Sequence, residues 1–247
     1  MPLFDMTAST CSEIEARLRL QRVPEIGSQR FHKLVAHFGS ARAALHASAA
    51  QWRAAGCSDA SAAARRDAQI HRDAEVAMAW LEQPHQHLLM WDQSDYPALL
   101  KEIADPPPLL FVRGDPSVLE LPQIAIVGSR RASPPGLDNA RAFARSLAGA
   151  GFAITSGLAL GVDGAAHQGA LDVGGRTIGV LGTVWKNFIH RSIVRWRKPS
   201  LRRAVPWFPS FPWMLKPSRA TFLGAIASSA ACRWAYWSSK PARPAVR

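Results

Sequence analysis

Apolar residues with helical spacing mark the first third of the chain. Ser12 followed by Glu15 has the form of a capping box, which predicts that a helix begins at Ser12. A second helix is predicted where four apolar residues recur at helical spacing before a glycine: Phe31, Leu34, Val35, Phe38 and Gly39. An alanine-rich helix is predicted over residues 59–83, with Arg65 on a solvated face of mixed charge.

In the middle third, short apolar runs alternate with helical segments. Strands are predicted at two places before residue 113 and at three buried places after it: 88–91, 109–112, 124–127, 152–155 and 177–181. Between the last three strands, one helix begins after the cap Ser133 and another begins near Asp163. Near-continuous apolar strands separated by helices predict an α/β fold, with a parallel sheet covered on both faces.

The turn between the first two helices, residues 23–28, reads apolar-Pro-x-apolar-Gly-Ser. This pattern resembles a helix-hairpin-helix element, whose backbone amides can hold a DNA phosphate. In the DNA-binding form a second glycine is usual where this chain has Ser28. A plain helical hairpin is therefore slightly favoured, and both interpretations stay open.

Small and basic residues follow two of the buried strands. Gly128-Ser129-Arg130-Arg131 follows the first, and Ser156-Gly157 follows the second, with Gly161 shortly after. In an open parallel sheet, ligands bind beyond the carboxyl ends of the strands, where glycine backbone, serine hydroxyls and arginine forks suit a phosphate. A phosphate-binding site is therefore predicted from these residues: Gly128, Ser129, Arg130, Arg131, Ser156 and Gly157. The competing interpretation is that the glycines serve turn geometry alone.

Other patterns disfavour nucleotide-dependent and metal-dependent enzymes. The chain has neither a GxGxxG motif after a strand nor a GxxxxGK[ST] loop. Asp163 and His167 stand four residues apart, but this is more typical of a first-turn acid and a locally packed histidine than of a catalytic pair. Cys11, Cys57 and Cys232 are too scattered for a zinc site or a disulfide framework, so no metal and no cofactor is predicted.

Charge is distributed unevenly along the chain. Residues 1–183 hold 17 Lys and Arg against 18 Asp and Glu, whereas residues 184–247 hold 13 Lys and Arg and no acid. The second segment is rich in Trp and Pro and shows no helical or alternating apolar period. It is either a basic arm that binds nucleic acid or out-of-frame sequence, and the second interpretation is favoured. No secretory signal is visible, which fits a cytoplasmic protein.

Three segments, taken in order, resemble the DprA/Smf family of DNA-processing proteins: Ile124–Arg130, Thr155–His167 and Gly175–Thr183. Asp95-Tyr96-Pro97 and Arg113-Gly114-Asp115, which precede them, fit the same family. The resemblance implies a helical SAM- or helix-hairpin-helix-like domain at 1–84. The first half of a Rossmann-like parallel sheet would follow at 85–183.

The resemblance also implies a function. It predicts a cytoplasmic protein, not an enzyme, that binds incoming single-stranded DNA during natural transformation. The family helps to load the RecA recombinase onto that DNA and forms homodimers, although the region expected to form the dimer is missing from this chain; no membrane partner is predicted. Carried over by position, the DNA-facing residues are those of the predicted phosphate site, in the runs Gly128–Arg131 and Ser156–Gly157.

The resemblance ends at Thr183. The family continues with a Gly-x-Asp motif, a Tyr-Pro pair and a second half-sheet, none of which follows Val184. The hypothesis is that residues 184–247 replace this half out of frame, leaving an apolar sheet edge uncovered and DNA binding impaired. Two alternatives stay open: a nucleotide-binding enzyme resembling phosphoribohydrolases, whose PGGxGT loop is not found here, and a remnant without function.

Overall fold

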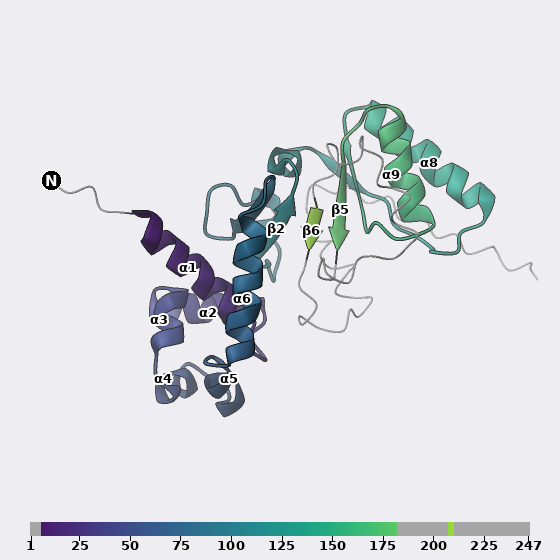
Figure 1. Ribbon diagram of the computed structural model, residues 1–247. Helices are drawn as coiled ribbons and strands as arrows, with labels where there is room; N and C mark the ends of the chain where they lie inside the picture. Colours follow the sequence, from purple (N-terminus) through teal and green to yellow (C-terminus); the bar gives the residue numbers. More distant parts are fainter. Residues whose placement is uncertain (1–5, 182–206, 210–247) are drawn as a thin grey trace, which may run out of the picture. The chain divides into compact units, whose positions relative to one another are not determined.

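The computed structural model describes residues 6–181 and 207–209, and the chain divides into two compact units. One unit is helical and comprises Met1–Gln86 with Ala104–Leu109. The other contains most of the sheet and comprises His87–Ile103 with Leu110–Arg247. Figure 1 shows the elements of both units.

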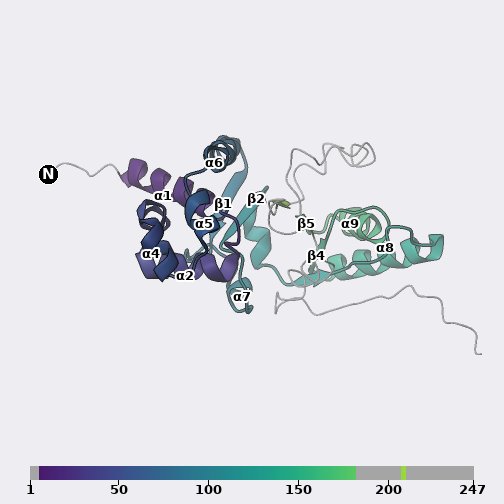
Figure 2. The same ribbon diagram turned by 90° about the horizontal axis from the view of Figure 1, so that it is seen from below.

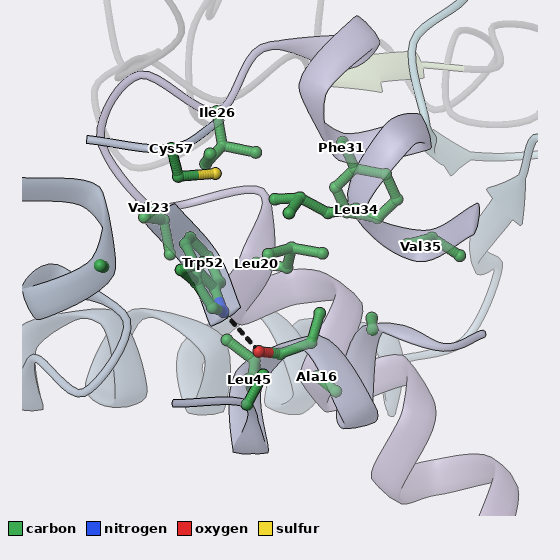
Figure 3. Close-up of a cluster of buried hydrophobic side chains, with 14 of the residues drawn as sticks. Ala16, Leu20, Val23, Ile26, Phe31, Leu34, Val35, Leu45, Trp52 and Cys57 are labelled. Carbon is green, nitrogen blue, oxygen red and sulfur yellow. Dashed lines mark hydrogen bonds between the residues drawn. The ribbon is translucent and has the colours of Figure 1, made fainter. Parts of the chain in front are cut away.

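The helical unit is built from short helices around one apolar core. Its helices are α1 Met6–Leu20, α2 Ser28–Phe38, α3 Ala41–His46, α4 Ala49–Ala54, α5 Asp59–Ala64 and α6 Ala68–Leu81. Leu20, Phe31, Leu34 and Trp52 are buried at its centre, and Figure 3 shows them together. The indole Nε1 of Trp52 donates a hydrogen bond to the Ala44 carbonyl at 2.6 Å, so this buried polar group is satisfied.

The first predicted helix begins earlier than its capping pattern indicated. Helix α1 begins at Met6, so Ser12 lies inside it, and the prediction of a start at Ser12 is wrong. The carboxylate of the next residue, Glu13, instead accepts hydrogen bonds from the amides of Ala41 and Arg42 at 3.0 and 3.1 Å. These amides stand at the start of α3 and have no acceptor within that helix. The second predicted helix is confirmed as α2, and Gly39 ends it with a left-handed φ of 82°.

The alanine-rich helix predicted over 59–83 is two helices, α5 and α6. The break is stabilised by Asp67, whose carboxylate accepts the Gln69 amide at 2.7 Å and caps α6. Arg65 ends α5 and is buried rather than solvated, because its guanidinium donates to the carbonyls of Ala47 and Ala62. Its place on a mixed-charge solvated face was therefore predicted wrongly.

The sheet has the strand order β1-β2-β6-β5-β4-β3. The strands are β1 Gln86–Met90, β2 Leu109–Arg113, β3 Gln123–Ala125, β4 Ala153–Ser156, β5 Thr177–Leu181 and β6 Trp207–Pro209. Strands β3, β4 and β5 are parallel, with Ile154 opposite Ile124 and Thr155 opposite Ile178. The predicted α/β class with a parallel sheet is confirmed. Short connections carry α7 Ala98–Lys101 and the 3-10 helix η1 Pro116–Glu120.

Helices α8 Pro134–Gly149 and α9 Val162–Asp172 pack on one face of β3 and β4. Figures 1 and 2 show the two helices side by side. They approach closely because Gly169 has no side chain: a Cβ there would lie 2.2 Å from the Arg141 carbonyl oxygen. Ile154 packs against these helices, whereas Ala153, one residue before it, belongs to the apolar cluster on the other face.

Strand β6, which belongs to the basic segment 184–247, lies beside β5 in the sheet. It pairs in parallel with β5, opposite Gly179–Leu181, and in antiparallel fashion with β2 at Arg113. The expectation that β5 would present an uncovered edge is therefore wrong over these residues, because β6 satisfies its backbone groups. The predicted character of the remainder of segment 184–247 falls outside the described residues.

Candidate nucleic-acid interface

Two loops meet at the carboxyl ends of β3 and β4. The first loop is Gly128–Arg131 and the second is Ser156–Gly161. The Val162 amide, at the end of the second loop, donates to the Ser129 carbonyl of the first at 3.2 Å. Gly161 has a φ of 84°, and a Cβ there would lie 2.2 Å from the same carbonyl oxygen. Backbone therefore contacts backbone between the loops, and only glycine fits at 161.

The Asp163 carboxylate connects the two loops. Its Oδ1 accepts the Gly128 amide at 3.4 Å and its Oδ2 accepts the Gly157 amide at 3.2 Å. The side chain is only 4% exposed. Burial raises the pKa of the Asp163 carboxyl above its ordinary value, and hydrogen bonds from the amides of Gly128, Ala159 and Gly157 act in the opposite direction. An anion thus already lies between the glycine amides that were predicted to face phosphate.

Ser156 is also engaged inside the protein. Its side chain is fully buried, and its hydroxyl donates to the Ile126 carbonyl at 2.6 Å. Just beyond the end of β3 at Ala125, the Ile126 amide donates to the Thr155 carbonyl at 3.0 Å. Together with the Ser156 bond, this contact extends the pairing of β3 with β4 by one residue. Three of the six predicted phosphate donors, the amides of Gly128 and Gly157 and the Ser156 hydroxyl, therefore have internal partners.

The other three predicted residues are exposed: Ser129, Arg130 and Arg131. The Ser129 hydroxyl accepts the Arg131 amide at 3.0 Å, which fixes a tight turn in the first loop. Within residues 6–181 and 207–209, no acidic side chain pairs with either guanidinium. Leu160 of the second loop is 50% exposed, although it stands next to the closely packed Gly161. Two free guanidiniums and one apolar side chain thus remain accessible on these loops.

His167 is separate from this surface, although it lies one helical turn from Asp163. It is buried, and its Nδ1 lies 2.6 Å from the Thr177 hydroxyl oxygen, which donates its own proton to the Ile154 carbonyl at 2.7 Å. Nδ1 therefore carries the proton and donates it to Thr177. Burial lowers the pKa of His167 to about 4, so the ring is neutral at pH 7. This is the locally packed histidine that the sequence favoured over a catalytic one.

The part of the chain that the structure describes holds no group of three or more His, Cys, Asp or Glu side chains suited to a metal ion. In that same part, every helix is too short or too polar to cross a membrane.

The hairpin turn before α2 is tied to the rest of the helical unit by Glu25. Its carboxylate accepts the Ser58 hydroxyl at 2.8 Å, and its φ of 65° is left-handed. Ser28, at the position of the missing second glycine, is buried at the start of α2. Helix α2, which follows this turn, carries two exposed basic residues, Arg30 and Lys33.

Family models match two stretches of the chain. Residues 87–205 match the family DNA recombination-mediator protein A, and residues 12–75 match the DprA-like N-terminal HHH domain. The second match assigns the hairpin of the helical unit to the helix-hairpin-helix class, whereas its contact with DNA stays a prediction. The first match runs past Thr183, where the resemblance seen in the sequence ended.

Individual relatives are similar over part of their length. The chain is 39% identical to Protein Smf of Escherichia coli over 148 residues, which are 60% of this chain and 40% of that protein. It is 46% identical to DNA processing protein DprA of Streptococcus pneumoniae over 88 residues, 36% of this chain and 31% of that protein. The chain thus spans less than half of these curated relatives. The X-ray structure of the pneumococcal DprA shares the fold, with a TM-score of 0.63 at 24% identity over 90% of this chain and 75% of that one.

Proposed function

Because the chain belongs to the DprA/Smf family of DNA-processing proteins, we propose that it binds single-stranded DNA through the two loops that follow β3 and β4. Arg130 and Arg131 contact successive backbone phosphates, and the Ser129 hydroxyl adds a donor. A groove of positive side chains that follows the backbone suits binding without sequence preference.

The observation that carries this proposal is the pair of exposed guanidiniums of Arg130 and Arg131, which have no acidic partner among the described residues and stand on a loop held by internal contacts. Ser129 fixes the turn, and Gly161 packs against the backbone beside Arg130, so the loop is ordered before DNA arrives. Preorganised donors lose little conformational entropy on binding, which favours affinity. Of the six residues predicted from sequence, the three with internal partners are proposed to support the loops, and Ser129, Arg130 and Arg131 are proposed to contact the DNA.

Leu160 extends the proposed surface from phosphates to bases. Its side chain is 50% exposed, next to the glycine that abuts Arg130. Bases of a single strand are unstacked and expose apolar faces, and apolar side chains of DNA-binding proteins contact such faces. A base would therefore rest on Leu160 while its phosphate is held by the first loop.

The later steps of the family's activity form part of the same proposal. We propose that the bound strand is passed to the RecA recombinase, without catalysis, in the cytoplasm. Support for these steps comes from family membership alone, since the chain spans 40% of the E. coli relative. Segment 184–247 is proposed to add nonspecific attraction to DNA, because it holds 13 Lys and Arg and no acid.

The experiment measures the affinity for an oligo-dT strand by fluorescence anisotropy between 50 and 300 mM salt, a range chosen to expose the electrostatic slope. Arg130→Ala is expected to weaken binding about tenfold and to lower the salt slope by about 0.7, the value for one lost phosphate contact. Arg176→Ala is the matched control, because Arg176 is an exposed arginine just before β5, at the amino end of the strand.

Two outcomes would contradict the proposal. Equal losses in Arg130→Ala and Arg176→Ala would show that only net charge matters. If the double variant Arg195→Gln and Arg197→Gln weakened binding while Arg130→Ala bound as tightly as the wild type, the basic segment would carry the binding instead.

A further inference from the structure

We propose that Asp163 is a positioning residue for DNA binding, whose carboxylate acts as a built-in anion that holds the two loops in their binding geometry. This inference rests on the proposed function. A carboxylate on its own repels DNA, whereas in this role the Asp163 carboxylate strengthens DNA binding.

The hydrogen bonds of Asp163 show why this residue controls both loops. One carboxylate oxygen accepts an amide of the first loop, from Gly128 at 3.4 Å, and the other accepts an amide of the second, from Gly157 at 3.2 Å. The space that the Asp163 carboxylate occupies between these two amides, here called the cradle, is thus formed by both loops. Asp163 is buried, whereas Gly128 is exposed and Gly157 is half-buried. Loss of the carboxylate would remove an acceptor that the two loops share, so each loop could move away from the other as its amide finds a new partner.

The backbone of the first loop rests directly on the start of α9. A Cβ at Gly128 would lie 2.8 Å from the Val162 side chain, and the Val162 amide donates to the Ser129 carbonyl. Val162 and Asp163 are adjacent, so a change in the position of Asp163 reaches Ser129 and Arg130 through this contact. The guanidinium of Arg130 is therefore held in place indirectly, by an acid that does not itself touch DNA.

The same geometry defines how DNA can be bound. Amides of glycine-rich loops at the ends of parallel strands hold phosphate in many nucleotide-binding proteins. Here the Asp163 carboxylate occupies that position, and a phosphate placed there would meet a buried negative charge. Phosphates of the DNA must therefore lie farther out, at the exposed guanidiniums of Arg130 and Arg131.

The sign of the effect makes the test decisive. Asp163→Asn and Asp172→Asn each remove one negative charge from α9. Asp172 pairs with Arg141 at 2.6 Å near the carboxyl end of that helix, away from the loops. If only charge mattered, both variants would bind oligo-dT slightly more tightly. We expect Asp163→Asn to bind about tenfold more weakly and Asp172→Asn to change by about twofold or less.

A rescue experiment separates positioning from general loss of stability. Asp163→Ala vacates the cradle, and sodium formate supplies a carboxylate small enough to enter it, with sodium chloride at equal ionic strength as the control. We expect formate, but not chloride, to restore most of the oligo-dT affinity, together with the thermal unfolding midpoint. Binding is measured at a temperature at which the melting curve shows each variant folded.

Two results would overturn the inference. Wild-type affinity in Asp163→Asn, or recovery of the unfolding midpoint in formate without recovery of binding, would show that Asp163 serves stability alone. Either result leaves the proposed function intact if Arg130→Ala still weakens binding. Failure of the proposed function is recognised separately, by Arg130→Ala binding as tightly as the wild type.

Discussion

Acid should destabilise this protein through His167, and the structure fixes both the direction and the size of the effect. The ring is buried and neutral, with Nδ1–H donating to the Thr177 hydroxyl at 2.6 Å. Nε2 has no hydrogen-bond partner among the described residues, so a proton added there would be buried without compensation.

The sign follows from the two pKa values. Burial lowers the pKa of His167 to about 4 in the folded protein. In the unfolded chain a histidine titrates at about 6.5, so between these values the unfolded state binds more protons. The stabilisation is therefore complete above about pH 6.5 and is lost as the pH falls toward 4. The loss is about 2 kcal/mol at pH 5 and about 3 kcal/mol over the whole interval.

The assay compares urea unfolding of the wild type and His167→Asn at several pH values between 5 and 7.5. An asparagine amide can still donate to Thr177 but does not titrate, so the variant is expected to lose about 2 kcal/mol less than the wild type between pH 7 and 5. Burial also raises the pKa of Asp163, which makes its own contribution run in the opposite direction, favouring the folded state at lower pH. That contribution is present in both proteins and cancels in the comparison. Parallel pH profiles for the two proteins would refute the reasoning.

Three further predictions concern the loops and the helical unit. Gly161→Ala should lower the free energy of unfolding by about 2 kcal/mol or more and weaken oligo-dT binding, because its Cβ would collide with the Ser129 carbonyl at a left-handed φ; urea unfolding and anisotropy measure the two effects. Leu160→Ala should weaken binding to oligo-dT but not to an abasic strand, and Leu160→Phe should strengthen the former by stacking. Ser48→Ala should cost about 1 kcal/mol in thermal unfolding, because it removes the capping box with Gln51.

The elements that sequence predicted well are those with a long, regular apolar pattern. Strand β5 was predicted with the bounds that the structure shows, and α8 begins after its cap Ser133 as expected. The glycine that ends α2 was also predicted. In each case the local pattern and the tertiary environment favour the same conformation.

The elements that were missed are short or depend on distant partners. Helices α3 and α4 are too short for a period to show, although the caps Ser40 and Ser48 mark their starts. Helix α1 passes through Ser12 despite a capping pattern there. Strand β6 has only three residues and no periodic context.

For the candidate site, sequence predicted that the two loops lie together beyond the carboxyl ends of β3 and β4, as they do, but it did not predict their hydrogen bonds. Gly128 and Gly157 carry the composition of a phosphate loop, and only the fold shows that their amides face Asp163. Asp163, two residues after Gly161, was visible in the sequence as an acid in the first turn of a helix. That position alone did not show that its carboxylate accepts hydrogen bonds from two loops.

The central claim, that single-stranded DNA lies on the first and second loops, is tested most directly by crosslinking. An oligonucleotide with 5-iodouracil at several positions is irradiated with the full-length protein, and the crosslinked peptides are identified by mass spectrometry. We expect crosslinks in Gly128–Arg131 and in residues 156–161, and their loss in Arg130→Ala. Crosslinks confined to residues 184–247 and unaffected by Arg130→Ala would contradict the claim.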